Sequence, residues 1–334
     1  MSIRNLVAYL VERWLWQARL TPLNLRARLQ GAQQLLLLGS ALEVGVFAAL
    51  DDGTLSASEL ASSLGLDGRA VWTVAEALVE AGYLTKSGSA YRLTAQSKDF
   101  FIRPSSPSYV ADSVMHSYQQ MGRWLSLPQV LKEGQPKERW RPPEALGHLV
   151  RALGKGAERI APKVVEECLG RAPSAKSLLD LGGGQGVYAK EFARSGLSVT
   201  LFDVPEAIEI AAAYLKGEEG ITLVAGNFLE SLPSGPFDIA FLGNVCHIYG
   251  PEENRALFSR LRPILSTKGL LAILDFVRGH SPMAATFGVN MLVSTKSGGT
   301  WTEAEYSQWL TQSDFCGVKI HHIEGRQLIL AEKE

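Results

Sequence analysis

The sequence predicts an α/β protein in which an open, mainly parallel sheet follows a mainly helical N-terminal domain. Three observations favour this fold class. The chain has 334 residues, which at roughly 150 residues per domain suggests two domains. Its second half alternates short apolar runs with amphipathic stretches, and a glycine-rich loop, Gly182 to Gly186, separates the first run from the first stretch. The first hundred residues instead show helical periodicity and end in two short strand-like runs.

The first hundred residues are expected to form short helices followed by a hairpin. Residues 5–20 are apolar over much of a helical circumference, so this helix needs a partner surface. Ser56 followed by Glu59 has capping-box spacing, which predicts that a helix begins there. A further helix precedes two short strands over residues 83–94. This order of helices and hairpin is typical of a winged helix.

The charge of this segment argues against nucleic-acid binding, a common function of winged helices. Its hundred residues carry nine basic and nine acidic side chains. The presumptive recognition helix offers only Arg69 as a cation, whereas a nucleic-acid surface needs several phosphate contacts. The whole chain is equally balanced, with 33 Lys and Arg against 34 Asp and Glu. The sequence therefore predicts no nucleic-acid partner.

A segment interrupted by prolines is expected to form a helical connector between the two domains. The resulting division of the chain is 1–103, 104–165 and 166–334. Four connector residues have helix-compatible spacing and mix aromatic, sulfur and polar groups: Met115, His116, Tyr118 and Trp124. A core stripe and the wall of a substrate pocket both explain this pattern. The pocket is favoured, because a buried histidine needs hydrogen-bond partners that a purely apolar stripe lacks.

From Ser177 the pattern changes to strands that alternate with helices. The expected strands are SLLDL, LSVTLFD, ITLVAGNF, FDIAFLGN and KGLLAILDFV. Such alternation implies right-handed crossovers and a parallel sheet. Two closing strands, GVKIHHI and RQLILAEK, are joined by a tight turn at Glu324 and Gly325, so we expect them to pair antiparallel.

The glycine loop gives the first chemical signal. Its glycines let the backbone approach a ligand at the N-terminus of the next helix, where free N–H groups face outward. A dinucleotide fingerprint needs glycine at position 187, which is occupied by Val187. The spacing therefore suits an adenosyl ligand without a pyrophosphate. Asp203, at the end of the second strand, is placed to accept hydrogen bonds from ribose hydroxyls.

Five segments in this order, LLDLGGGQG, DVPEAIEIA, GNF, NVCHIYGPEEN and GLLAILDFV, resemble the S-adenosylmethionine-dependent O-methyltransferases of the caffeate and acetylserotonin type. The resemblance covers nearly the whole chain, including the connector segment WLSLPQVLKEGQP. It implies a Rossmann-like class I methyltransferase sheet, an N-terminal mainly helical winged-helix dimerisation domain, S-adenosylmethionine as donor and S-adenosylhomocysteine as product. The donor site expected on this basis comprises Asp180, Gly182, Gly183, Gly184, Asp203, Val204, Asn227, Phe228, Gly243 and Asn244.

The resemblance also implies the catalytic pair. His247 follows the fourth strand, where family members have a general base that acts on the acceptor hydroxyl. Asp275, at the end of the fifth strand, is the expected acidic partner that holds the imidazole tautomer and stabilises the imidazolium. Both lie beyond the carboxyl ends of adjacent strands, the usual ligand crevice of an open parallel sheet. The alternative is a loop histidine with a purely structural role.

The sequence departs from the family pattern at three places. Where relatives have a second acidic residue in an E-R-T segment, this chain has Thr300, Trp301 and Thr302. Asn227 stands where an adenine-side aspartate is usual, and Gly243 where a lysine is often found. Donor binding is expected to survive all three changes, but the acceptor is not expected to be a simple phenol. The residues expected to face it, on one helix, are Phe287, Asn290, Met291 and Ser294.

The sequence thus predicts a homodimeric, cytoplasmic methyltransferase that acts on a hydroxyl of a small aromatic or apolar metabolite. The dimer is expected because Trp14 and Trp16 would expose much apolar surface on the first helix. Neither a signal peptide nor a run of about 20 apolar residues is apparent, so no membrane partner is expected. The three cysteines lack CxxC spacing, and no metal is invoked.

Three alternatives remain open. The first is methylation at carbon of a pigment or polyketide-like acceptor, for which a base near the acceptor is still useful. The second is a nucleotide-dependent oxidoreductase, which Val187 disfavours because it interrupts the pyrophosphate fingerprint. The third is a non-enzymatic winged-helix regulator that senses a nucleoside, which the neutral charge of the first hundred residues disfavours.

Overall fold

The computed structural model describes residues 22–137 and 144–334. The chain divides into two compact units, of which the first ends at Tyr118 and the second begins at Gln119, inside helix α7 (Ala111–Trp124). Each unit has its own hydrophobic core. The helix expected over residues 5–20 lies outside the described residues. None of the described helices is both long and apolar enough to cross a membrane.

The first unit consists of short helices around a small antiparallel sheet. Its elements before α7 are α2 (Pro22–Glu43), α3 (Val46–Ala49), β1 (Leu55–Ser56), α4 (Ala57–Leu64), α5 (Gly68–Glu80), β2 (Leu84–Ser87), β3 (Ala90–Leu93) and α6 (Ala95–Phe101). The expected capping box is present, because the Ser56 side chain accepts from the Glu59 N–H while the Ser56 N–H donates to the Glu59 carboxylate at 2.8 Å. The expected hairpin is also present, and β1 adds a third strand in the order β1-β3-β2.

The second unit is an α/β structure. Its elements after α7 are α8 (Leu127–Glu133), α9 (Glu144–Ala157), α10 (Ala161–Arg171), β4 (Ser177–Leu181), α11 (Val187–Arg194), β5 (Ser198–Asp203), α12 (Pro205–Tyr214), β6 (Ile221–Ala225), β7 (Phe237–Gly243), the short turn η1 (Cys246–Ile248), α13 (Pro251–Leu261), η2 (Arg262–Ile264), β8 (Leu265–Asp275), α14 (Ala284–Ser294), α15 (Glu303–Gln312), β9 (Phe315–Ile323) and β10 (Arg326–Lys333). All the strands expected from Ser177 onward are found.

The seven strands of this unit form one sheet in the order β6-β5-β4-β7-β8-β10-β9. The first five are parallel to their neighbours, as the alternation of strands and helices predicts. The closing hairpin is antiparallel, as expected from its tight turn. It folds back so that β10, and not β9, pairs with β8, with Gln327 opposite Asp275. The first residues of β10 therefore lie beside the carboxyl end of β8.

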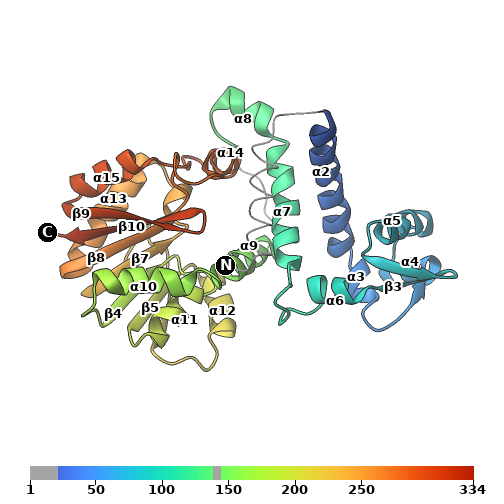
Figure 1. Cartoon of the computed structure of the whole chain (residues 1–334), viewed down its shortest axis with the longest axis horizontal. Helices are drawn as coiled ribbons and strands as arrows, with labels where there is room; N and C mark the ends of the chain where they lie inside the picture. Colours follow the sequence, from blue (N-terminus) through green and yellow to red (C-terminus); the bar gives the residue numbers. More distant parts are fainter. Residues whose placement is uncertain (1–21, 138–143) are drawn as a thin grey trace. The chain divides into compact units, whose positions relative to one another are not determined.

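Helices cover both faces of the sheet (Figure 1). Successive strand residues point to opposite faces, and Leu178 and Leu179 accordingly belong to different hydrophobic clusters. The cluster that contains Leu178 includes side chains of α10 and α11, whereas the cluster that contains Leu179 includes side chains of α13 and α15. Because both faces are covered, the loops at the carboxyl ends of the parallel strands are left to form a ligand site.

Candidate active site

The loop between β4 and α11 has a backbone that requires glycine. Gly182, Gly184 and Gly186 have φ values of 72°, 56° and 90°, in the left-handed region that side chains disfavour. A Cβ on Gly186 would also lie 2.7 Å from Leu215 Cδ1. The loop therefore combines a tight turn with close packing, and it leads directly into the N-terminus of α11.

Asp203, the last residue of β5, is held against this loop. Its carboxylate accepts hydrogen bonds from the Gly184 N–H at 2.8 Å and from the Val204 N–H at 2.7 Å, one at each oxygen. Burial raises the pKa of Asp203, while these two hydrogen bonds lower it. Each carboxylate oxygen keeps a further lone pair. Asp203 can therefore accept two more hydrogen bonds, which is what a pair of ribose hydroxyls would donate.

Asp180, on β4, is a buried carboxylate that receives a weak contact from the Ala189 N–H and no hydrogen bond of ordinary geometry from the described residues. It is 1% exposed. Burial, followed by the charge of Asp203, raises its pKa to about 7. An unpaired buried carboxylate is costly unless a ligand compensates for it. Together with the loop and Asp203, it forms a site suited to a nucleoside that carries a positive charge.

The remaining residues expected at the donor site lie at the same edge of the sheet, with varied environments. Asn227 bonds to its own loop through both ends of its amide. The ring of Phe228 packs edge-on against Tyr249 at 5.7 Å between centroids. Asn244 has a φ of 61°, and its side-chain oxygen accepts from Arg326. A Cβ on Gly243 would lie 3.0 Å from the Phe241 ring.

His247 and Asp275 form a buried pair at the carboxyl ends of β7 and β8. The Asp275 carboxylate contacts His247 Nδ1 at 2.7 Å through Oδ1 and accepts the His247 backbone N–H at 3.0 Å through Oδ2. His247 is 6% exposed and Asp275 is fully buried. The ring of Phe287 on α14 meets the His247 ring edge-on, at 4.8 Å. The pairing expected from the sequence is therefore present.

Two further groups donate to the same carboxylate. The Phe276 N–H donates to Asp275 Oδ1 at 2.7 Å, and the Tyr306 hydroxyl on α15 donates to Oδ2 at 3.0 Å. Burial and the charge of Asp275 raise the pKa of Tyr306 well above its ordinary value, so the hydroxyl stays protonated. Tyr306 could not be recognised from the sequence, because a tyrosine on the apolar face of a helix looks like an ordinary core residue.

The turn that carries His247 is fixed from α13. The Asn254 side chain is fully buried, and its amide donates to the carbonyl oxygens of Cys246, Tyr249 and Gly250, each at 3.0 Å. Backbone groups of this turn are thus satisfied by one side chain, which keeps the position of His247 well defined. The sequence alone did not indicate this role of Asn254 either.

The segment where relatives have a second acidic residue makes structural contacts instead. The Thr300 hydroxyl donates to the Ala284 carbonyl at 3.0 Å. Trp301 Nε1 donates to the Cys246 carbonyl at 3.3 Å. Thr302 caps α15, where its side chain accepts from the Glu305 N–H. Asp275 is therefore the carboxylate that contacts the His247 ring in this part of the structure.

The expected acceptor residues of α14 differ in what they contact. Phe287 contacts the His247 ring, as described above, and Asn290 Oδ1 accepts from Trp124 Nε1 at 3.2 Å. Met291 is buried. Ser294 lines a cavity in the second unit. The structure thus brings Trp124 of the connector together with α14.

The other three connector residues belong to the first unit, so their place in an acceptor pocket stays a prediction. Met115 is buried. Tyr118 packs against α2, because a Cβ on Gly39 would lie 2.2 Å from its ring, and its hydroxyl donates to Glu43 at 3.0 Å. This contact gives Tyr118 a structural role within the first unit. His116 is described in the same helix, α7.

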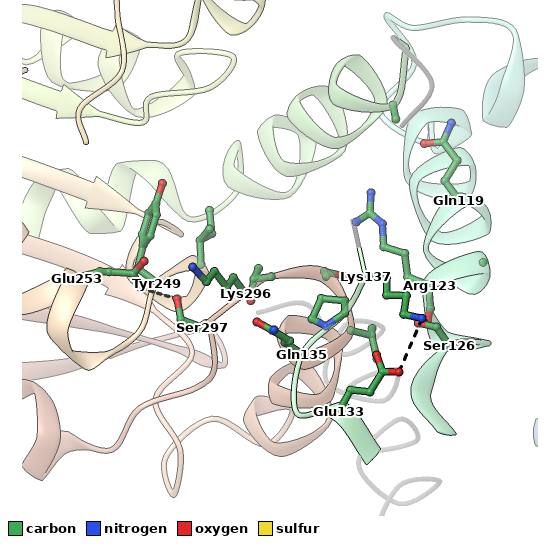
Figure 2. A pocket seen from close by; sticks show the side chains of 17 residues that line it. Gln119, Arg123, Ser126, Glu133, Gln135, Lys137, Tyr249, Glu253, Lys296 and Ser297 are labelled. Carbon is green, nitrogen blue, oxygen red and sulfur yellow. Dashed lines mark hydrogen bonds and ion pairs between the residues drawn. The ribbon is translucent and has the colours of Figure 1, made fainter. Parts of the chain in front are cut away.

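The cavity has a volume of about 1060 Å³. It is bounded by the end of α7, the segment after α8, the residues that follow His247, and the end of α14. Its polar lining includes Arg123, Lys137, Lys296, Glu133 and Glu253. Figure 2 shows Arg123 extending from α7 toward the side on which Lys296 lies. Of the lining residues, only Ser294 was expected from the sequence.

Comparisons with known proteins find similar sequences among methyltransferases. The sequence model of the O-methyltransferase domain matches residues 158–316. A tetracenomycin polyketide synthesis 8-O-methyltransferase of Streptomyces glaucescens is 24% identical over 86% of this chain and 89% of its own length. A 3-hydroxy-5-methyl-1-naphthoate 3-O-methyltransferase of Streptomyces sahachiroi is 27% identical, over 82% of this chain and 83% of its own length.

Solved structures show the same fold. PigF with SAH has a TM-score of 0.78 at 23% identity, and the match covers 94% of this chain and 100% of PigF. Human N-acetylserotonin methyltransferase in complex with SAM has a TM-score of 0.74 at 21% identity, with 95% and 100% coverage. These likenesses confirm the α/β fold with a helical N-terminal region.

Proposed function

We propose a methyltransferase activity for this chain, because it belongs to the S-adenosylmethionine-dependent O-methyltransferase family. Its methyl donor is S-adenosylmethionine, and its product is S-adenosylhomocysteine. The proposal is that the chain transfers the methyl group to a hydroxyl of a small aromatic or polyketide-type metabolite, with His247 as general base. The observation that carries it is the buried His247–Asp275 pair.

The donor site is proposed at the loop between β4 and α11. When bound, S-adenosylmethionine supplies an electrophilic methyl group on a sulfonium. Asp203 would accept the ribose hydroxyls, since its oxygens keep lone pairs beyond the bonds from Gly184 and Val204. Asp180 would face the cationic end of the donor, because it is a buried carboxylate whose oxygens accept no hydrogen bond of ordinary geometry from the described residues. Backbone N–H groups of the loop complete the site.

The base is proposed to act through Nε2. Nδ1 of His247 is bonded to Asp275 Oδ1, so a neutral imidazole with its proton on Nδ1 leaves Nε2 free to accept the acceptor's proton. When Nε2 takes this proton, the ring becomes an imidazolium. Its Nδ1 is then already hydrogen-bonded to the Asp275 carboxylate. Asp275 thereby fixes the ring orientation and offsets the new charge.

The acceptor is proposed to be a fused-ring aromatic or polyketide-type phenol. Two observations support this class. The cavity beside the His247 turn, at about 1060 Å³, is large enough for a multi-ring molecule. The relatives from Streptomyces act, by their names, on a tetracenomycin polyketide and on a hydroxynaphthoate. Methylation at carbon remains the second candidate, because the same base serves either atom.

The test is incubation with S-adenosylmethionine and a panel of hydroxylated naphthalenes, anthraquinones and their carboxylated forms. We expect methylated product and an equal amount of S-adenosylhomocysteine by mass spectrometry, with an O-methyl signal in the proton NMR spectrum. A C-methyl signal would favour the second candidate. Donor cleavage without any methylated acceptor across the panel would contradict the proposed acceptor class.

We also propose that the chain is a cytoplasmic homodimer joined through its first unit. The expected first helix lies outside the described residues, but α2 supports the proposal. Leu25, Leu29 and Leu36 lie on one face of α2, and their exposed fractions are 48%, 62% and 44%. A row of exposed leucines on one helix favours burial against a partner.

A further inference from the structure

Tyr306 contacts Asp275 of the His247–Asp275 pair. It lies on α15, which the family's base and donor motifs do not include. We infer that Tyr306 is a positioning residue for methyl transfer: its hydroxyl fixes the Asp275 carboxylate in the orientation that holds the His247 imidazole. The inference rests on the proposed role of His247 as the base. It adds a residue from α15 to a site otherwise built from the ends of β7 and β8.

The donors to Asp275 divide evenly between its two oxygens. Oδ1 contacts His247 Nδ1 at 2.7 Å and the Phe276 N–H at 2.7 Å. Oδ2 accepts the His247 N–H at 3.0 Å and the Tyr306 hydroxyl at 3.0 Å. The two backbone donors belong to the same strand ends that carry the pair. Among the described residues, Tyr306 is therefore the one donor that ties the carboxylate to a different layer of the fold.

The loss of that bond would leave Oδ2 with a single donor in a fully buried position. A buried oxygen that loses its donor gains nothing from water in return, so the cost is larger than for an exposed bond. Rotation of the carboxylate about its own axis would recover part of that cost, but it would lengthen or misalign the 2.7 Å contact between Oδ1 and Nδ1. A small rotation of the Asp275 carboxylate would thus shift the His247 ring and move Nε2 away from the acceptor hydroxyl. Reaction rates depend steeply on such placement.

A neutral donor has a further consequence for charge. The position where relatives have a second acidic residue is Thr300, whose hydroxyl bonds to the Ala284 carbonyl at 3.0 Å. When His247 takes a proton here, one imidazolium faces one carboxylate, and the buried pair has no net charge. Tyr306 supports that carboxylate without adding a second negative charge, whose burial would itself be costly.

The Tyr306 ring is held firmly enough to define the place of its hydroxyl. Tyr306 is fully buried. Its ring packs edge-on against Trp309 at 5.6 Å, and Trp309 packs in the same manner against Trp301 at 5.4 Å. Trp301 in turn donates to the Cys246 carbonyl at 3.3 Å, next to His247. A series of edge-to-face ring contacts therefore links α15 to the turn that carries His247.

The experiment compares Tyr306→Phe with a matched control, Tyr91→Phe. Phenylalanine keeps the ring against Trp309 and removes the hydroxyl alone. Tyr91, in the first unit, is also a buried tyrosine whose hydroxyl donates to a carboxylate, that of Glu76. Both variants lose the same kind of bond. Only the loss at Tyr306 should affect catalysis.

We expect Tyr306→Phe to lower kcat about tenfold, with the Kd for S-adenosylhomocysteine changed less than about twofold because the donor site is untouched. The loss should be largest for weakly acidic phenols and should shrink for nitro-substituted ones, which need less help from a base. A purely structural role would lower activity equally for all acceptors. Assays at saturating donor keep a weakened variant folded by mass action.

The inference is overturned if Tyr306→Phe keeps full kcat, if its loss is the same for every acceptor, or if its loss does not exceed that of Tyr91→Phe. His247→Ala is run in parallel to separate the two hypotheses. If His247→Ala loses activity while Tyr306→Phe does not, only the role of Tyr306 fails. If His247→Ala is fully active, the proposed base itself fails. The double variant Tyr306→Phe with Asp275→Asn should have nearly the same kcat as Asp275→Asn alone, because both substitutions disrupt the hydrogen bond between Tyr306 and Asp275.

Discussion

Gly184 and Asp203 are joined by a hydrogen bond from the Gly184 N–H to Asp203 Oδ2, 2.8 Å long. The bond connects the glycine loop after β4 with the end of β5, and so holds the carboxylate before any ligand arrives. Such preorganisation lowers the entropy cost of binding. The geometry of the proposed donor site is therefore set by contacts within the chain itself.

Replacement of Asp203 should weaken donor binding. Asp203→Ala removes the acceptor proposed for the ribose hydroxyls, and a hydrogen bond to a charged group contributes roughly 1.5–3 kcal/mol. We expect the Kd for S-adenosylhomocysteine to rise by roughly 10- to 100-fold in calorimetry. Asp238→Ala, at the opposite ends of β4 and β7, is the control. Equal affinity in Asp203→Ala and the unaltered protein would contradict this donor site.

The buried carboxyl of Asp180 makes stability depend on pH in an unusual direction. Its pKa is raised to about 7 from the ordinary 3.8, so between these values the folded protein holds a proton that the unfolded chain has lost. The free energy of unfolding contributed by this group therefore falls as pH rises through that window. Asp180→Asn stays neutral and removes the effect.

We expect Asp180→Asn to raise the unfolding temperature of the ligand-free protein at pH 8 and to change it much less at pH 5. A shift of roughly 2–4 °C is expected for each kcal/mol. The same variant should bind S-adenosylmethionine more weakly at pH 8. Thermal unfolding that responds identically at both pH values would show that Asp180 does not titrate in this range.

Asn254 is expected to control the position of the base. Asn254→Ala removes the donor to three carbonyls of the turn that carries His247. The free energy of unfolding should fall by about 1–3 kcal/mol, since buried carbonyls lose their partner. In steady-state kinetics kcat should fall while donor KM is retained. A variant with lower stability but full kcat would show that the turn does not need this side chain.

The exposed leucines of α2 give a test of assembly. Leu29→Glu places a charge in the middle of the exposed row that Leu25 and Leu36 complete. We expect light scattering to find a dimer for the unaltered chain and a monomer for this variant. Leu131 on α8 is also exposed, at 72%, so Leu131→Glu is the control and should leave the dimer intact. A monomeric unaltered chain would contradict the proposed assembly.

Local sequence signals predicted the elements well. The capping box at Ser56 and the glycine spacing at Gly182 to Gly186 each depend on a few adjacent residues, and the structure contains both. The antiparallel hairpin at Glu324 follows from its turn in the same way. The insertion of β10 next to β8 was not predicted, because strand order depends on tertiary pairing that no local pattern records.

The site was predicted only as far as the family motifs reach. His247 and Asp275 stand in segments that resemble relatives, and they are in contact. Tyr306 contacts Asp275, and Asn254 contacts the turn that carries His247, but the helices on which they lie gave no sign of either contact. Their importance depends on a single hydroxyl and a single amide, and these are placed by packing of α13 and α15 against the sheet. Such placement becomes visible only in three dimensions.

The most direct test of the account is the turnover of His247→Ala on acceptors of graded acidity, with Asp275→Asn beside it. Donor and acceptor placement does not need His247, whereas general base catalysis adds about 10²- to 10⁴-fold. We predict that His247→Ala lowers kcat by that factor while the Kd for S-adenosylhomocysteine is retained, that Asp275→Asn loses less, and that both losses shrink as the acceptor becomes more acidic. A His247→Ala protein that keeps most of its kcat on every acceptor would contradict the account.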